Sequence, residues 1–384
     1  MDFEKENYIY SNNYSKLIKN ENLKYILKLF IIFILPFIVV DILINIEIYN
    51  FSLKSNVKMK NMFLNFKNDL SNSILGLKNF KEFKTIKIEI EDFNDINNAE
   101  YKQNQNEFCN NENEYYNREF ENKIKLSKII FKNITYFMYI YKQKDIVSSD
   151  ISKINAWEKY ETNNLIKGLD FYKKKNNLIN KDIYIIDIGG NVGWYTFFLG
   201  RFGYNLITFE PFKINYYILN KNYCLNKTLN VTLINKGLFS EEKKCHIYSP
   251  SNNIGNGMIN CNEKVDEKII SNGEIILTKL SNYISFFKNK NLAMIKMDIE
   301  GSEGKAFESG IELITKYHVP FILMEYIPSF LRKYGTNPKT FLEMFINNGY
   351  KINVKNFFEK KNYDIKYLLK GNKSLYIVYI PFLE

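Results

Sequence analysis

The stretch Asp187-x-Gly189-x-Asn191-x-Gly193 combines an acid with glycines directly after the apolar run 183–186. Glycine tolerates positive φ and close approach of another backbone, so the stretch predicts a buried strand that ends in a tight turn before a helix. The first amides of such a helix point toward a ligand above the carboxyl end of the strand. The pattern therefore predicts a site for a nucleotide-like ligand.

The carboxylate of Asp187 restricts the kind of ligand. A loop that binds pyrophosphate has the pattern G-x-G-x-x-G, and a carboxylate that faces two phosphates would repel them. S-adenosylmethionine carries an ammonium and a sulfonium, so it suits an acid at this position. Glu210 ends another short apolar run, 205–210, and lies 23 residues after Asp187. An acid there can accept hydrogen bonds from both hydroxyls of a ribose.

A second group of acids lies at and just after the end of the predicted strand 293–298, where Asp298, Glu300 and Glu303 are close in sequence. Acids at the carboxyl end of a strand can position a hydroxyl, accept its proton or hold a cation. Glu303 is equally consistent with the first turn of a helix, where an acid complements the helix dipole. We expect the catalytic base among Asp298, Glu300 and Glu325, with His246 as a weaker candidate. Two adjacent acids without a third ligand in view do not predict a metal site.

Regular alternation of strands and helices after residue 157 must position these groups. It predicts an α/β domain with a doubly wound, Rossmann-like and mostly parallel sheet, because helices then cover both faces. No clear helix separates the last two strands, so we expect them to pair antiparallel at one edge. A longer insertion lies between 240 and 292, and its Gly- and Asn-rich residues 252–261 are expected to form a loop that covers a site. The seven predicted strands are Ile183–Ile188, Leu206–Glu210, Val231–Asn235, Ala293–Asp298, Phe321–Tyr326, Tyr350–Val354 and Leu375–Ile380.

Five motifs in this part of the chain resemble the FkbM family of S-adenosylmethionine-dependent methyltransferases, which have the class I methyltransferase fold. The resemblance covers residues 157–355 and is carried by their order and spacing together. One departure is that a Leu-Asp pair before the fourth strand is Leu280-Ser281 here. The motifs are DIGGNVGWYT at 187–196, FEP at 209–211, NKGL at 235–238, IKMDIEGSE at 295–303 and LMEY at 323–326.

The resemblance implies a role for most of the candidate residues. Glu210 would bind the ribose of S-adenosylmethionine, Asn235 would lie at the adenine edge, and Asp298 would lie beside the methyl group. The methionine part would be held by Asp187, Gly189, Asn191 and Gly193.

The function that these observations predict is S-adenosylmethionine-dependent methylation, with similarity to the family suggesting a hydroxyl acceptor on a sugar, a glycan or a related small molecule. Methyl transfer mainly requires an aligned nucleophile about 3 Å from the methyl carbon and the exclusion of water. Two alternatives stay open. One is a non-catalytic membrane adaptor on a methyltransferase-like fold, which the loss of an acid at Ser281 would suit. The other is an NAD-dependent oxidoreductase, against which the acid at Asp187 argues.

The first 150 residues differ in composition from the rest. Residues 1–22 predict a polar, disordered leader, and residues 23–48 contain the apolar run LFIIFILPFIVV. A bilayer span needs about 20 mostly apolar residues, so we expect a single-pass signal anchor at 23–48, with endomembrane localisation as one option. A buried helix or a cleaved signal peptide are the alternatives. Residues 49–150 predict an Asn/Lys-rich stem, with a helix at 124–141, before a methyltransferase domain at 151–384.

Composition excludes some classes of function. The formal charge is +11 over 384 residues, but no clustered arginines alternate with stacking aromatics, so we expect no nucleic-acid partner. The four cysteines have no C-x-x-C spacing, which argues against a zinc site and leaves the redox compartment open.

Overall fold

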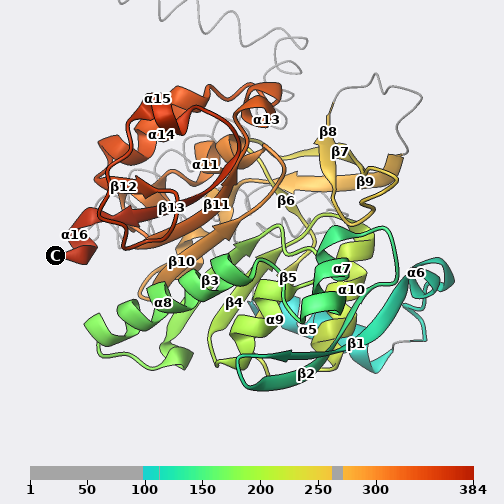
Figure 1. The fold of residues 1–384 in the computed structure, drawn as a ribbon. Coiled ribbons are helices and arrows are strands. Elements are labelled where there is room, and N and C mark those ends of the chain that lie inside the picture. The colour runs from blue at the N-terminus through green and yellow to red at the C-terminus, as the bar shows by residue number, and fades with distance from the viewer. Residues whose placement is uncertain (1–97, 112, 262–270) are drawn as a thin grey trace, which may run out of the picture. The chain divides into compact units, whose positions relative to one another are not determined.

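A seven-stranded sheet forms the centre of the computed structural model, which describes residues 98–111, 113–261 and 271–384 (Figure 1). Its chain order reverses between β3 and β10, and the carboxyl ends of these neighbours are where a doubly wound sheet binds ligands. The strands in spatial order are β12 (Tyr350–Asn353), β13 (Lys373–Tyr379), β11 (Phe321–Tyr326), β10 (Asn291–Met297), β3 (Ile183–Ile188), β4 (Asn205–Phe209) and β5 (Val231–Ile234).

The sheet is mixed, as the sequence predicts. Strand β13 runs antiparallel to both β11 and β12, whereas the pairs from β11 to β5 are parallel. The seven predicted strands and the antiparallel pair at one edge are therefore confirmed. Strand β13 lies inside the sheet and β12 forms the edge, an order that periodicity alone does not reveal.

Alternation along the central strand divides its side chains between two apolar cores. Ile183 and Ile185 point into one core, and Ile186 and Ile188 point into the other. Both cores exclude water from these side chains, which explains why β3 is apolar on both faces. The first core is covered by α8 (Lys159–Lys175), α9 (Trp194–Arg201) and α10 (Lys213–Cys224). The second is covered by η3 (Leu280–Phe287), α11 (Glu303–Gly310), α12 (Glu312–Thr315) and α14 (Pro338–Asn347).

Residues 124–141 form a β-hairpin, so the helix predicted there is wrong. Strands β1 (Ile124–Phe131) and β2 (Ile134–Tyr141) pair antiparallel across a two-residue turn, Lys132-Asn133, whose φ angles are 52° and 61°. Both angles are positive, as a tight hairpin turn requires. Ile129 and Met138 are buried on one face of the hairpin, so the apolar period is two residues instead of 3.6.

One side-chain amide of the central domain pairs with the backbone of the hairpin. The Asn222 side chain on α10 accepts a hydrogen bond from Tyr139 N at 2.5 Å and donates one to Tyr139 O at 2.9 Å. Its amide nitrogen also donates to Val192 O, in the turn after β3, at 3.0 Å. The hairpin therefore supports the turn that the sequence marks as a binding site. Between the hairpin and α8 lies α7 (Ile146–Ile154).

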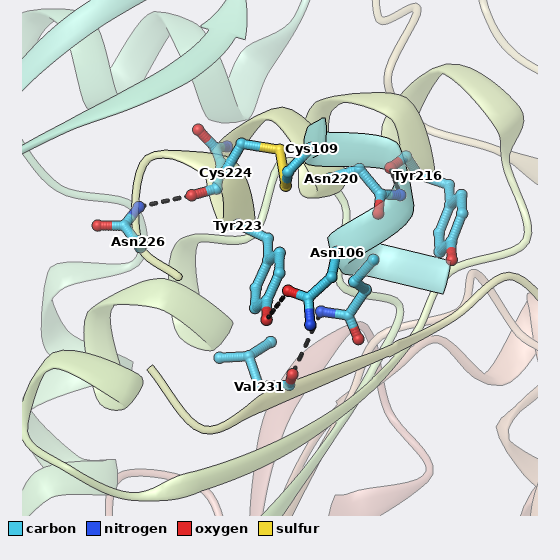
Figure 2. Close-up of a disulfide and its surroundings, with 10 residues drawn as sticks. Asn106, Cys109, Tyr216, Asn220, Tyr223, Cys224, Asn226 and Val231 are labelled. Atoms are coloured by element: carbon cyan, nitrogen blue, oxygen red, sulfur yellow. Dashed lines mark hydrogen bonds between the residues drawn. A yellow bond between two sulfur atoms is a disulfide. The ribbon is translucent and has the colours of Figure 1, made fainter. Parts of the chain in front are cut away.

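Helix α5 (Asn98–Asn110) covers the free edge of the sheet at β5. The Gln105 side chain donates to Val231 O at 3.2 Å and accepts from Leu233 N at 3.1 Å, so one amide pairs with the edge strand as a neighbouring strand would. A disulfide joins Cys109 on this helix to Cys224 on α10 (Figure 2). The short α6 (Arg118–Lys123) follows α5. Residues 98–150 thus pack in the same compact unit as the sheet, within the range assigned to the stem.

Most strands of a second sheet lie in the insertion 240–292, and the first part of the loop predicted at 252–261 connects two of them. A four-stranded sheet is formed by β6 (Gly237–Leu238), β9 (Ser271–Thr278), β7 (Lys243–Tyr248) and β8 (Met258–Asn260), in that order. A second disulfide joins Cys245 to Cys261 across the β7–β8 hairpin. The remaining elements are η2 (Asn180–Asp182), α13 (Pro328–Lys333), α15 (Ile365–Leu368) and α16 (Ile380–Leu383).

The leader, the membrane anchor at 23–48 and the first half of the stem lie outside the described residues. Within the described ranges, none of the helices is both long and apolar enough to span a bilayer.

Candidate active site

A cavity of about 260 Å³ opens at the carboxyl ends of β3, β4, β10 and β11. The order of the strands along the chain reverses between β3 and β10. A doubly wound sheet binds its ligands at the carboxyl ends of such neighbouring strands. Of the nine residues that the sequence singles out, six line the cavity and three do not. The six are Gly189, Asn191, Glu210, Asp298, Glu300 and Glu325, whereas Asp187, Gly193 and Asn235 lie outside its wall.

The turn after β3 needs glycine for steric reasons. Gly189 has φ +82°, and a Cβ at this residue would lie 2.0 Å from the carbonyl oxygen of Asp298. Asn191 also has a positive φ, 50°, and Gly193 has φ 91° before α9 begins. The amides of Gly189 and Gly190 donate to Phe209 O at 2.9 and 3.1 Å. The predicted tight turn is therefore confirmed, and it lies between the ends of β4 and β10.

Asp187 lies inside the protein instead of facing the cavity. It is 1% exposed, and its Oδ2 accepts a hydrogen bond from the Thr196 hydroxyl at 2.6 Å. Burial raises the pKa of Asp187 above its usual value, although the nearby Lys296 ammonium opposes this. Asp187 and Lys296 are partners across β3 and β10. In this structure Asp187 therefore organises the turn and the strand behind it, so the direct contact with a ligand that we expect for it stays a prediction.

Glu210 is held by backbone amides on two sides. Its Oε2 accepts from Asn191 N at 2.8 Å and its Oε1 accepts from Phe212 N at 2.9 Å. Burial raises the pKa of Glu210 to about 7, although both amides favour the charged form. Each carboxylate oxygen has a second lone pair, so it can still accept from a ligand. Asn235 donates to the backbone oxygen of Glu210 at 2.8 Å and positions this loop from outside the cavity.

The loop between β7 and β8 forms a second wall of the cavity. Gly255 O accepts hydrogen bonds from the side chains of Asn191 at 3.2 Å and Asn215 at 2.9 Å. The Asn215 side chain in turn accepts from the Tyr141 hydroxyl, on β2, at 2.6 Å. This wall therefore depends on the N-terminal hairpin, and nothing in the sequence pattern of either segment predicts the contact.

Three carboxylates converge on the other side of the cavity. Oxygens of Asp298, Glu300 and Glu325 all lie within 4.8 Å of one another. Burial, followed by repulsion from Asp298, raises the pKa of Glu300 to about 7 and that of Glu325 to about 8. At neutral pH this group therefore contains both a carboxylate that can accept a proton and a carboxyl that can donate a hydrogen bond. Their spacing would also admit a divalent cation, but we assign none.

Two charged residues of the cavity wall, Lys296 and Glu158, contact groups beside the acids but were given no role from the sequence. The Lys296 ammonium lies 3.5 Å from Asp298 Oδ2, and Glu158 accepts a hydrogen bond from the Tyr195 hydroxyl at 2.6 Å. A lysine between apolar residues of a buried strand is an available signal for Lys296. Glu158 precedes α8 far from any motif, so its place in the cavity follows only from the fold.

Part of the chain matches a known protein family. Residues 187–352 match the family model of the methyltransferase FkbM domain. No curated protein matches the chain.

Several solved structures align with this chain at low sequence identity and low TM-score. Monomeric WbdD, a bifunctional kinase-methyltransferase, aligns with this chain at 8% sequence identity and a TM-score of 0.35. The alignment covers 60% of this chain and 43% of WbdD. The Pyrococcus abyssi tRNA (uracil-54, C5)-methyltransferase, solved with S-adenosyl-L-homocysteine, gives 10% identity and a TM-score of 0.29, covering 66% and 44%. A T. thermophilus 16S rRNA methyltransferase, solved with AdoMet and guanosine, aligns at 9% sequence identity with a TM-score of 0.31. That alignment covers 66% of this chain and 50% of the other.

This chain thus spans about two fifths of the length of WbdD. The family match includes the turn after β3, Glu210 and the three converging carboxylates. The family to which this chain is similar, over residues 187–352, is therefore that of the methyltransferase FkbM domain.

Proposed function

We propose that the chain transfers the methyl group of S-adenosylmethionine to a hydroxyl of a sugar, a glycan or a related small molecule. The observation that carries the proposal is that one cavity combines the glycine turn, Glu210 and the acids at the ends of β10 and β11. The turn and Glu210 suit a nucleoside, and the acids suit a cationic methyl donor next to an acceptor.

The residues fit the cofactor in chemical terms. Glu210 would accept hydrogen bonds from the ribose hydroxyls, and Asn191 lies beside it in the same wall. S-adenosylmethionine supplies a methyl carbon activated by its sulfonium. The protein then has to exclude water, align the acceptor oxygen and remove its proton.

The acid cluster supports a hydroxyl acceptor because an alcohol must lose a proton during transfer. The acceptor oxygen forms a bond to the methyl carbon while the carbon–sulfur bond breaks, and sulfur keeps that electron pair. The proton passes to a carboxylate of the group Asp298, Glu300 and Glu325, which lines the cavity.

Binding and transfer should be tested separately on the full chain. Isothermal titration with S-adenosylhomocysteine tests the cofactor site, with NADH as the control ligand. Transfer of a labelled methyl group to cell-derived glycans and lipids, followed by mass spectrometry for one added methylene, identifies the acceptor. Failure to bind S-adenosylhomocysteine would overturn the proposal, whereas binding without any transfer would favour an adaptor.

We also propose that the protein folds in an oxidising compartment, attached by the predicted anchor at 23–48. All four cysteines of the sequence pair in the structure, as Cys109–Cys224 and Cys245–Cys261. Disulfides persist in secretory compartments and are rare in the cytosol. Alkylation of the protein in intact cells, before and after reduction, should show four thiols only after reduction. Four free thiols without reduction would refute the compartment.

A further inference from the structure

Glu158 is a carboxylate of the cavity wall that comes from outside the family match. The match begins at residue 187, whereas Glu158 lies just before α8 and is partly exposed in the cavity. Its backbone is in the left-handed region, with φ 40° and ψ 56°, a conformation that is unfavourable for a residue other than glycine. The surrounding structure must therefore hold this residue in place.

Side chains from the first turn of α9 fix the start of α8. The Tyr195 hydroxyl donates to Glu158 Oε2 at 2.6 Å. Trp194 Nε1 donates to the Thr162 hydroxyl at 3.0 Å, and this hydroxyl in turn donates to Trp157 O at 3.1 Å. Because α9 begins directly after the glycine turn, Glu158 keeps a fixed position relative to that turn.

Among the described residues, the carboxylate of Glu158 has no cationic partner within ion-pair distance. Its Oε2 accepts from the neutral hydroxyl of Tyr195. Lys296, whose charge acts on Glu158, pairs instead with Asp298 at 3.5 Å. A carboxylate in this situation can accept a charge-assisted hydrogen bond from a ligand, which is stronger than a neutral one. Glu158 is therefore suited to a cationic group of a ligand.

The other acids of the site have neighbours or roles of their own. Both oxygens of Glu210 accept from backbone amides, and this residue suits the ribose. Oxygens of Asp298, Glu300 and Glu325 lie within 4.8 Å of one another on the other side of the cavity, where we place the acceptor. Asp187, for which the resemblance implies contact with the methionine part, is 1% exposed and lies outside the cavity wall. An ammonium in this cavity therefore needs a different carboxylate.

We propose that Glu158 binds the ammonium of the methionine part of S-adenosylmethionine, in place of Asp187. This inference rests on the proposed function. The Oε1 atom of Glu158 accepts a hydrogen bond from the ammonium, while the Tyr195 hydroxyl keeps Oε2 in position. A residue that precedes the family match thus completes the cofactor site. The ammonium of a ligand should then contribute to affinity only while residue 158 carries a carboxylate.

The test is isothermal titration of the full chain with three ligands that differ in the amino-acid part. They are S-adenosylhomocysteine, its deaminated analogue with hydrogen in place of the ammonium, and 5′-methylthioadenosine, which has neither ammonium nor carboxylate. Glu158→Gln should bind S-adenosylhomocysteine roughly 10- to 100-fold more weakly, as loss of a hydrogen bond to a charged group does. It should bind the two ligands without an ammonium at least as well as the wild type does. The glutamine keeps an oxygen for the Tyr195 hydroxyl, so the start of α8 should stay in place.

Three further variants serve as controls. Glu161→Gln removes a carboxylate of α8 that does not line the cavity, and should leave all three affinities unchanged. Tyr195→Phe removes the hydroxyl that holds Glu158, and should weaken only S-adenosylhomocysteine, by about 2- to 10-fold. Asp187→Asn should affect the three ligands alike. The thermal midpoint without ligand shows whether each variant has folded.

Three results would overturn the inference. The first is that Glu158→Gln weakens S-adenosylhomocysteine and 5′-methylthioadenosine alike. The second is unchanged S-adenosylhomocysteine binding in Glu158→Gln, with or without a higher KM for the acceptor, and the third is a loss selective for the ammonium in Asp187→Asn. Should Glu158→Gln not fold, Tyr195→Phe decides, since equal effects on the three ligands would then reject the inference. Failure of the wild-type protein to bind S-adenosylhomocysteine would instead reject the proposed function itself.

Discussion

Replacement of Glu210 by glutamine gives the sharpest test of the cofactor site. The carboxylate lines the cavity, is 5% exposed, and accepts hydrogen bonds from Asn191 N and Phe212 N at 2.8 and 2.9 Å. A glutamine places an NH₂ group against one of these two N–H donors and removes the charge. The ribose hydroxyls then lose an ionised acceptor, which is a stronger partner than a neutral one.

The structure sets the size of the effect. Hydrogen bonds to a charged group contribute about 1.5–3 kcal/mol, so S-adenosylhomocysteine should bind the Glu210→Gln variant roughly 10- to 100-fold more weakly at pH 8. Burial raises the pKa of Glu210 to about 7, and its anionic form therefore prevails above that pH. If the ligand needs the anion, wild-type affinity falls about tenfold from pH 8 to pH 6, which is about 1.4 kcal/mol.

Isothermal titration at both pH values measures these changes, and Glu303→Gln is a matched control. Glu303 is equally buried, has a pKa raised to about 7 by burial, and accepts from Ile299 N at 3.1 Å and Gly301 N at 3.3 Å. It does not line the cavity. The reasoning is wrong if Glu210→Gln keeps the tenfold dependence on pH, or if Glu303→Gln weakens binding as much as Glu210→Gln does.

Three further predictions concern stability. Gly189→Ala should lower the free energy of unfolding by about 3 kcal/mol or more in urea titration, because its Cβ would meet Asp298 O at 2.0 Å and its φ is +82°; wild-type stability would contradict the described turn. The double variant Cys109→Ser with Cys224→Ser opens a link between residues 115 apart and should lower Tm by about 5–10 °C, measured by calorimetry; an unchanged Tm would mean that the bond does not form. The native pKa of Glu303 lies above its unfolded value of 4.5, so the folded state holds a proton that the unfolded state has lost. The free energy of unfolding should therefore fall as pH rises from about 5 to above 7. Denaturant titration should find a smaller fall in Glu303→Gln, and an equal fall would exclude this residue as the source.

The sheet was predictable because its strands are apolar on both faces and end at glycines or acids, which are typical of turns. Ile183–Ile188 stops at a glycine whose φ is positive, and the acids of 298–303 follow a buried strand in the same way. The carboxyl ends of adjacent parallel strands meet at one edge, so sequence sufficed to bring Glu210 and Asp298 into one cavity.

Other parts of the site depend on contacts between distant segments. Lys296 and Asp187 become partners only when β10 lies next to β3, and of the two only Lys296 lines the cavity. Glu158 reaches the cavity from the start of α8. The hairpin at 124–141 was mistaken for a helix because short apolar runs fit either period, and its turn is Lys-Asn instead of the more telling Asn-Gly.

Gln105 protects the edge of the sheet, so a truncated version of the protein should keep this residue. Its amide occupies Val231 O and Leu233 N, the groups through which β5 would otherwise pair with another chain. A protein that begins at residue 151 would keep every motif of the methyltransferase domain and yet present this strand uncovered, as a template for edge-to-edge aggregation. Insolubility of such a fragment would reflect a missing helix, so recombinant versions should start upstream of Asn98.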